Sequence, residues 1–212
     1  MKRVVQVSSL SLFALLLALG AAKADPNASE ARSVPAFHAI DLAGTIEVDV
    51  TVGKPASVQV SGEPDLLDQV ITTVKDGVLV IDTRRELKKR NHLRASVTVP
   101  DLTAIALSGT GAMKVSGVAN ESFGISLPGT GQVVVTGSTS SLRVVVDGTG
   151  EIAAKDLAAK AATVEVNGTG SATLRVSQSL EAKVTGTGSI DVHGKPARVK
   201  KSVSGVGSIH IR

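Results

Sequence analysis

Residues 123–135 carry the sequence FGISLPGTGQVVV. Apolar residues occupy every second position before Gly129 and again after Gly131. This period of two is typical of a β-strand that buries one face. A Gly-Thr-Gly triplet separates the two runs, so the stretch predicts two strands joined at a glycine corner.

The same pattern recurs along the second half of the chain. Gly-x-Gly occurs six times, at intervals of 20, 19, 20, 18 and 19 residues. The twelve corner glycines are Gly109, Gly111, Gly129, Gly131, Gly148, Gly150, Gly168, Gly170, Gly186, Gly188, Gly205 and Gly207. Equivalent strands of successive repeats can pair in parallel and stack their apolar side chains. The repeat therefore predicts an all-β, right-handed parallel β-helix or β-solenoid, with two short strands per coil of about 19 residues and a short loop between them.

The corner glycines have two interpretations. A Gly-x-Gly turn can bind phosphate, but such a site needs a following helix and usually a third glycine or a lysine. Here an alternating strand pattern follows every corner. We therefore favour a structural role, in which each corner requires either a positive φ angle or close packing of neighbouring coils.

The N-terminus predicts export. Lys2 and Arg3 precede the apolar run Leu10–Leu19, and the triplet Ala22-Lys23-Ala24 matches a signal peptidase site. Ten apolar residues are too few to span a bilayer, so a cleaved signal peptide over residues 1–24 is favoured over a membrane anchor. No transmembrane segment is expected after cleavage, and residues 25–33 are expected to form a flexible tail.

Composition narrows the classes of site. The chain has no cysteine, which excludes disulfides and thiolate metal sites. Without the signal peptide only Phe37 and Phe123 remain as aromatic residues, which leaves few platforms for stacking sugars or bases. Cleavage also removes three cationic residues and no acidic residue, so the formal net charge becomes 20 − 19 = +1. Because this charge is small, no nucleic-acid partner is expected.

Residues 34–212 are predicted to form a single domain, with irregular opening coils over 34–101 and regular Gly-x-Gly repeats over 102–212. The strand-like stretches of the opening region are Thr45–Val52, Ser57–Val60, Val78–Ile81 and Ala95–Val99. A short helical turn is expected after Pro64, with Asp65 as a possible cap. In the last coil, Lys201 falls at a position that is apolar in earlier coils. We hypothesise that it discourages end-to-end stacking of an open edge.

The sequence shows no catalytic constellation, metal-ligand pattern or cofactor motif, and predicts a protein that is not an enzyme. The four histidines are scattered, although Asp191 and His210 occupy equivalent outward positions on successive coils. The densest charged feature is residues 84–94, RRELKKRNHLR. Its cations Arg84, Arg85, Lys88, Lys89, Arg90 and Arg94 form a candidate polyanion-binding loop. The alternative is a solvated hairpin between Ile81 and Ala95.

Several segments together resemble a known family. They are Phe37-x-x-Ile40, Val58-x-Val60-x-Gly62, Asp76-Gly77-x-Leu79-x-Ile81 and Val97-x-Val99-Pro100-x-Leu102, followed by the serial Gly-x-Gly corners. Over residues 34–212 the chain resembles the head GIN domain family, labelled as putative auto-transporter adhesins. The resemblance implies a β-solenoid and an exported location. We expect the protein in the periplasm, at the cell surface or outside the cell. It supplies no catalytic or ligand residues.

Three functions remain open from the sequence. The first is an exported, non-enzymatic binding or adhesion module of the bacterial cell envelope, which presents its outward faces to an envelope or surface polysaccharide or protein. The second is a periplasmic structural or assembly protein that forms homo-oligomers through solenoid faces or ends. The third, a polysaccharide-active enzyme, is disfavoured because neither a cleft nor a catalytic set is expected.

Overall fold

The computed structural model describes residues 28–84 and 93–212. The expected signal peptide and residues 85–92 of the basic loop lie outside the described residues. In chain order the elements are β1 (Ala28–Arg32), β2 (Ala39–Leu42), β3 (Glu47–Val52), β4 (Ser57–Gly62), α1 (Pro64–Leu67), β5 (Val70–Lys75), β6 (Val78–Thr83), β7 (Arg94–Val99), β8 (Ala104–Leu107), β9 (Thr110–Leu127), β10 (Thr130–Val146), β11 (Thr149–Val166), β12 (Ser171–Val184), β13 (Ser189–His193), β14 (Arg198–Val203) and β15 (Ser208–Ile211).

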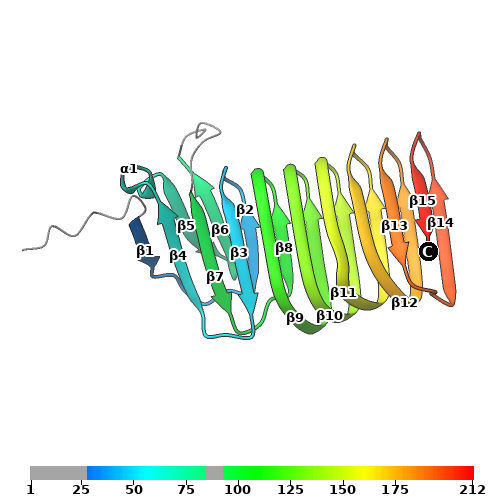
Figure 1. Ribbon diagram of the computed structural model, residues 1–212, viewed down its shortest axis with the longest axis horizontal. Coiled ribbons are helices and arrows are strands. Elements are labelled where there is room, and N and C mark those ends of the chain that lie inside the picture. The colour runs from blue at the N-terminus through cyan, green and yellow to red at the C-terminus, as the bar shows by residue number, and fades with distance from the viewer. Residues whose placement is uncertain (1–27, 85–92) are drawn as a thin grey trace, which may run out of the picture.

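Successive coils stack side by side along the long axis of the molecule (Figure 1). Strands β9 to β12 pair in parallel, each with the equivalent strand of the next coil. Val133 of β10, for example, lies opposite Met113 of β9 and Ile152 of β11. The predicted all-β parallel solenoid is confirmed.

The two arms of a central coil are joined differently from what the sequence predicted. We expected a short loop between them, but β9, β10 and β11 run unbroken for 18, 17 and 18 residues around the bend. The bend keeps its inter-coil pairing, because Ser138 lies opposite Ala119 on one side and Ala158 on the other. Register shifts such as that between Val134 and Thr136 absorb the curvature.

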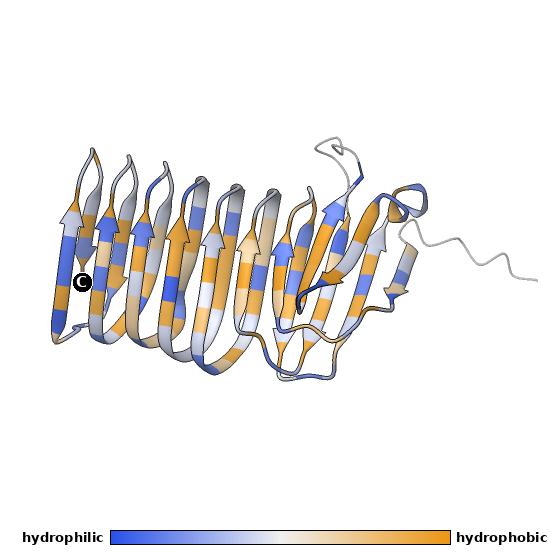
Figure 2. Cartoon of the chain, turned by 180° about the vertical axis from the view of Figure 1, so that it is seen from behind, coloured by the Kyte–Doolittle hydropathy of each residue, from blue (hydrophilic) through white to orange (hydrophobic). Residues whose placement is uncertain are grey.

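The core consists of aliphatic side chains stacked in columns from coil to coil. Alternating apolar and polar residues along each arm are visible in Figure 2. One fully internal column contains Leu79, Ile40, Ile105, Ile125, Val144, Val164 and Ala182, none of them more than 3% exposed. No single coil could bury such a face alone, so the columns hold the stack together.

Close packing, rather than an unusual φ angle, explains the corner glycines. Only Gly131 and Gly205 of the twelve have positive φ, at 152° and 139°. At every corner glycine, however, an added Cβ would lie within 3.0 Å of an atom of the preceding coil, mostly a backbone carbonyl oxygen. Coils can therefore approach each other at this edge only where the side chain is absent.

The opening region is threaded out of sequence order. The coil formed by β2 and β3 lies between the coil of β6 and β7 on one side and that of β8 and β9 on the other. The sequence correctly predicted β3, β4, β6 and β7 but missed β2 and β5. Leu42 lies opposite Leu107, so Gly44 stands in register with Gly109 and forms a further corner that the glycine count overlooked.

The N-terminal end of the stack is covered by antiparallel strands and α1. β1 pairs with β4, β4 with β7, and β5 with β6. The expectation of a flexible tail is therefore corrected for Ala28–Arg32, where Arg32 also donates a hydrogen bond of 2.8 Å to the Leu67 carbonyl. Glu63, not Asp65, is the N-cap residue of α1, and it makes no side-chain capping hydrogen bond.

The last coil is much more exposed than the others. All six residues of β14 are exposed, and Val199 and Val203 expose 43% and 46% of their surface. Lys201 lies opposite Ala182, as the sequence predicted, but it is exposed because no described strand lies beyond β14 to cover it.

Candidate binding site

The basic loop departs from the corner edge of the solenoid. β6 ends at Thr83 and β7 begins at Arg94, and these strands pair with β2 and β3 respectively. The expected hairpin is wrong, because β6 and β7 belong to two different columns of strands and do not pair with each other. The loop thus replaces a glycine corner. Arg85, Lys88, Lys89 and Arg90 lie outside the described residues.

Arg94 is already occupied by two carboxylates on the neighbouring coil. Its guanidinium lies 2.6 Å from Glu47 Oε2 and 2.8 Å from Asp49 Oδ2. Register explains the contact, since Arg94 lies opposite Glu47 and Asp49 projects from the same outward face. Arg84 is exposed, and its backbone N–H donates to the Gln69 carbonyl at 2.9 Å. Of the two described cations of the loop, only Arg84 is therefore left to meet a ligand without breaking an ion pair.

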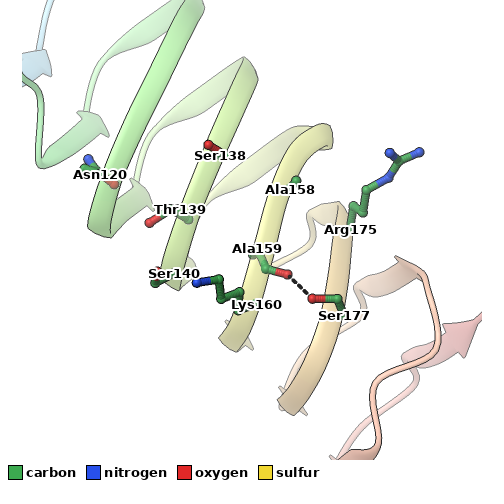
Figure 3. A pocket seen from close by; sticks show the side chains of 9 residues that line it. All are labelled: Asn120, Ser138, Thr139, Ser140, Ala158, Ala159, Lys160, Arg175 and Ser177. Atoms are coloured by element: carbon green, nitrogen blue, oxygen red, sulfur yellow. Dashed lines mark hydrogen bonds between the residues drawn. The ribbon is translucent and has the colours of Figure 1, made fainter.

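A groove of about 340 Å³ lies on the opposite edge, across the bends of β10, β11 and β12 (Figure 3). On each of these strands, two of the lining residues are spaced two positions apart. They are Ser138 and Ser140 from β10, Ala158 and Lys160 from β11, and Arg175 and Ser177 from β12. Within this set, Ala158 lies opposite Ser138 on one side and Arg175 on the other.

The groove exists because the middle strand carries alanines at its bend. Ala158 is exposed and Ala159 is only 3% exposed, so neither raises a long side chain between the flanking strands. Leu157, immediately before them, turns into the core and is fully buried. The small residues on β11 thus leave a depression between the side chains of β10 and β12.

Hydrogen-bonding groups line this depression, and some of them are already engaged. The buried Thr139 hydroxyl donates to the Ser141 carbonyl at 3.1 Å, and the Ser177 hydroxyl donates to the Ala159 carbonyl at 3.3 Å. Asn120 Nδ2 donates to the Leu102 carbonyl at 2.7 Å, whereas its Oδ1 is buried without a partner among the described residues. The hydroxyls of Ser138 and Ser140 form no hydrogen bond with any residue that the structure describes, so they remain available to a ligand.

Lys160 and Arg175 give the groove a positive charge. In Figure 3 Lys160 extends toward Ser140, while Arg175 extends away from the strands into solvent. Neither cation forms an ion pair with another described residue. No acidic side chain is present among the described residues that line the groove. The site therefore has an uncompensated charge, which attracts anions.

A second depression of about 340 Å³ lies next to the groove, farther along β11. Ser141, Ala161 and Ser179 line it, each following directly or closely on a residue of the first groove. Arg198 of β14 adds a cation, and Lys200 is held by Glu181 at 2.6 Å. We refer to these two neighbouring depressions together as the trough.

Asp191 and His210 lie opposite each other on β13 and β15, as expected. The carboxylate of Asp191 is engaged instead by Arg212, at 3.0 Å.

Within residues 28–84 and 93–212 no group of three or more potential metal-ligating side chains comes together. The same described residues contain no helix with the length and apolar character needed to cross a membrane.

Sequence reasoning missed the groove because its residues come from four successive coils, at bends where the register shifts. One signal was present in the sequence. The segment 158–162, AAKAA, interrupts the larger aliphatic residues of the repeat with four alanines around one lysine.

Comparison with known proteins assigns the family. Residues 36–196 match the model of the family described as "Putative auto-transporter adhesin, head GIN domain". A crystal structure of a putative adhesin from Bacteroides fragilis NCTC 9343 has a TM-score of 0.67 and 23% identity, covering 88% of this chain and 97% of that one. A putative adhesin from Parabacteroides merdae ATCC 43184 has a TM-score of 0.50 and 16% identity, with 88% and 96% covered.

These two structures share the solenoid fold with this chain, and no curated protein matches its sequence. The family match spans well over half of the residues, including the opening coils and five of the six Gly-x-Gly corners. The chain belongs to the head GIN domain family of putative auto-transporter adhesins.

Proposed function

We propose that this protein is an exported, non-enzymatic binding module of the bacterial cell envelope, which presents its outward faces to an envelope or surface polymer. One observation carries the proposal. Polar side chains from successive coils line up in register, about 4.7–4.9 Å apart as in any sheet, and so form extended surfaces rather than a closed pocket. Membership of a family named for adhesins supports the same function.

Two surfaces of the protein are candidates for contact with the polymer. The basic loop at the corner edge would use Arg84, Arg85, Lys88, Lys89 and Arg90, whereas Arg94 is held by Glu47 and Asp49. The trough at the bend edge would use Lys160, Arg175 and Arg198. Both would attract anionic polymers, because clustered cations raise the local concentration of polyanions.

Binding of the purified protein to isolated cell envelopes tests this function, together with fractionation of cells that express it. We expect retention on envelopes, and recovery outside the cytoplasm. Failure to bind any envelope fraction would contradict the proposal. Charge reversal at the five loop cations then asks whether the loop takes part, and unchanged binding would exclude it.

A second candidate is a structural or assembly role in the periplasm, through self-association of the solenoid. The exposed strand β14, with Val199 and Val203, favours it. Lys201 would then oppose association by placing a charge in the apolar column. We expect Lys201→Val to increase self-association in analytical ultracentrifugation. An unchanged sedimentation coefficient would contradict this role for Lys201.

A further inference from the structure

The chemistry of the surface restricts which polymer can bind. Neutral sugars and nucleic-acid bases are commonly held by stacking on aromatic rings. The chain has no Trp or Tyr, and Phe37 and Phe123 are buried in the core. Because the described surface offers no Phe, Tyr or Trp ring for stacking, a ligand must be recognised through charge and hydrogen bonds.

The groove across β10, β11 and β12 supplies both positive charge and hydrogen-bonding groups. Arg175 can form two parallel hydrogen bonds to a carboxylate or sulfate, and Lys160 provides a point charge two residues along the neighbouring strand. Ser138 and Ser140 on the facing strand present hydroxyls that can bond to sugar hydroxyls. The groove therefore presents cations and hydroxyls together, which match a sugar ring that carries both acidic and hydroxyl groups.

The shape favours a chain over a single sugar. Ala158 and Ala161, three residues apart on β11, line two neighbouring depressions, and three residues of extended strand span roughly 10 Å. Arg198 repeats in the second depression the role that Arg175 has in the first. A polymer with an acidic group at intervals would meet a cation in each.

We infer that the trough along β11, centred on Lys160 and Arg175, binds an acidic polysaccharide that carries carboxylate or sulfate groups. The inference names the ligand class of the binding module and therefore rests on the proposed function. Nucleic acid fits less well, because the trough has few cations and no Phe, Tyr or Trp side chain among the described residues that line it.

Binding of the full-length protein to soluble polymers tests the assignment. The probes are polygalacturonate, dextran sulfate, neutral dextran and duplex DNA, measured by isothermal titration calorimetry at low ionic strength. We expect both acidic polysaccharides to bind, neutral dextran not to bind, and DNA to bind at least tenfold more weakly. Equal or tighter binding of DNA would overturn the inference, since the surface would then attract any polyanion.

Removal of the two cations tests the location. Lys160→Ala with Arg175→Ala should weaken binding of the acidic polysaccharides roughly 25-fold, about fivefold for each exposed charge contact. The matched control, Lys114→Ala with Lys183→Ala, removes the same charge from exposed positions outside the groove and should change affinity less than twofold. Equal loss in both double variants would contradict the inference.

A neutral variant tests the shape. Ala158→Gln fills the groove without a change of charge and should weaken binding at least tenfold. Its control is Ala119→Gln, an exposed alanine in the same row of the sheet but outside the groove. If envelopes bind the protein but both glutamine variants bind polysaccharide equally, the trough assignment fails while the proposed function stands.

Discussion

The corner edge and the bend edge of the same coils are built by opposite means. At the corner, neighbouring coils approach so closely that an added Cβ would meet the backbone of the preceding coil. At the bend, side chains fill the space, and Leu157 and Val118 turn into the core with at most 1% exposure. Packing at the corner edge requires glycines, which have no side chain, whereas packing at the bend edge is made by buried side chains.

The two edges therefore differ in how freely their side chains can change without loss of the fold. Each regular coil from Gly109 onward repeats the glycine corner, because it packs directly on the backbone of the preceding coil. The bend tolerates register shifts, such as those between Ala154 and Ala158 and between Val134 and Thr136. A repeat protein of this kind therefore maintains its scaffold at the constant edge and can vary its surface at the other.

The largest effect is expected at the corner. Gly131→Ala should lower the free energy of unfolding by about 4 kcal/mol, because it combines a positive φ angle with a clash against the Gly111 carbonyl. The control is Gly124→Ala, whose Cβ would meet Ala104 Cβ at an ordinary 3.5 Å. Urea unfolding should place this control within about 0.5 kcal/mol of wild type. Equal losses would remove the distinction between corner and arm.

A cavity at the bend should have the next largest effect. Leu157→Ala removes a fully buried side chain and should cost about 3 kcal/mol in urea unfolding. The neighbouring Ala158→Gln, on the exposed side of the same bend, should cost less than about 0.5 kcal/mol. If Leu157→Ala unfolded at the same urea concentration as wild type, buried side chains would not stabilise the bend.

A polar ladder at the corner should contribute less. Asn167 donates to Asp147 Oδ1 at 2.8 Å and accepts from the Thr185 hydroxyl at 2.5 Å, which links three coils on the outer surface. Asn167→Ala should cost about 1 kcal/mol, since exposed hydrogen bonds are partly replaced by water. A loss as large as that of Gly131→Ala would mean that the ladder, and not close backbone packing, holds this edge.

The smallest effect concerns pH at the far end of the trough. The Lys200 ammonium donates a hydrogen bond to Glu181 and lowers the pKa of that carboxyl below its ordinary value of 4.5. The contribution of the pair is therefore present above about pH 4.5 and is lost as pH falls through the lowered pKa. Compared with wild type, Glu181→Gln should flatten the fall of thermal stability in this acid range, and high salt should reduce the difference. Identical pH profiles would exclude the pair from any role in stability.

The regular half of the fold could be predicted from the sequence. Its repeated pattern, alternating apolar residues on both sides of Gly-x-Gly, indicates both the strands and the corner between them. The opening region could be predicted only strand by strand. Val48 and Val50 identify β3 through alternation, but nothing local indicates that its coil lies between two later ones. Ile46 stands where later coils have their second glycine, so the corner at Gly44 escaped the Gly-x-Gly count.

The candidate site shows the same limit more strongly. The basic loop is contiguous in sequence and was found at once, yet its Arg94 turned out to bind Glu47 and Asp49 across a coil boundary. The groove joins Ser138, Lys160 and Arg175 from three different repeats. Which of these residues become neighbours depends on shifts of register at the bends, and the alternation of apolar and polar residues does not predict those shifts.

Nuclear magnetic resonance of the 15N-labelled protein, titrated with polygalacturonate, tests most directly whether ligand binds at the bend edge and leaves the corner edge free. We predict that backbone amide signals of residues 138–140, 158–160 and 175–177 shift with added polymer. Amides of the corners at residues 129–131 and 148–150 should stay in place. Shifts confined to the corners, or to the loop at residues 84–94, would contradict this account.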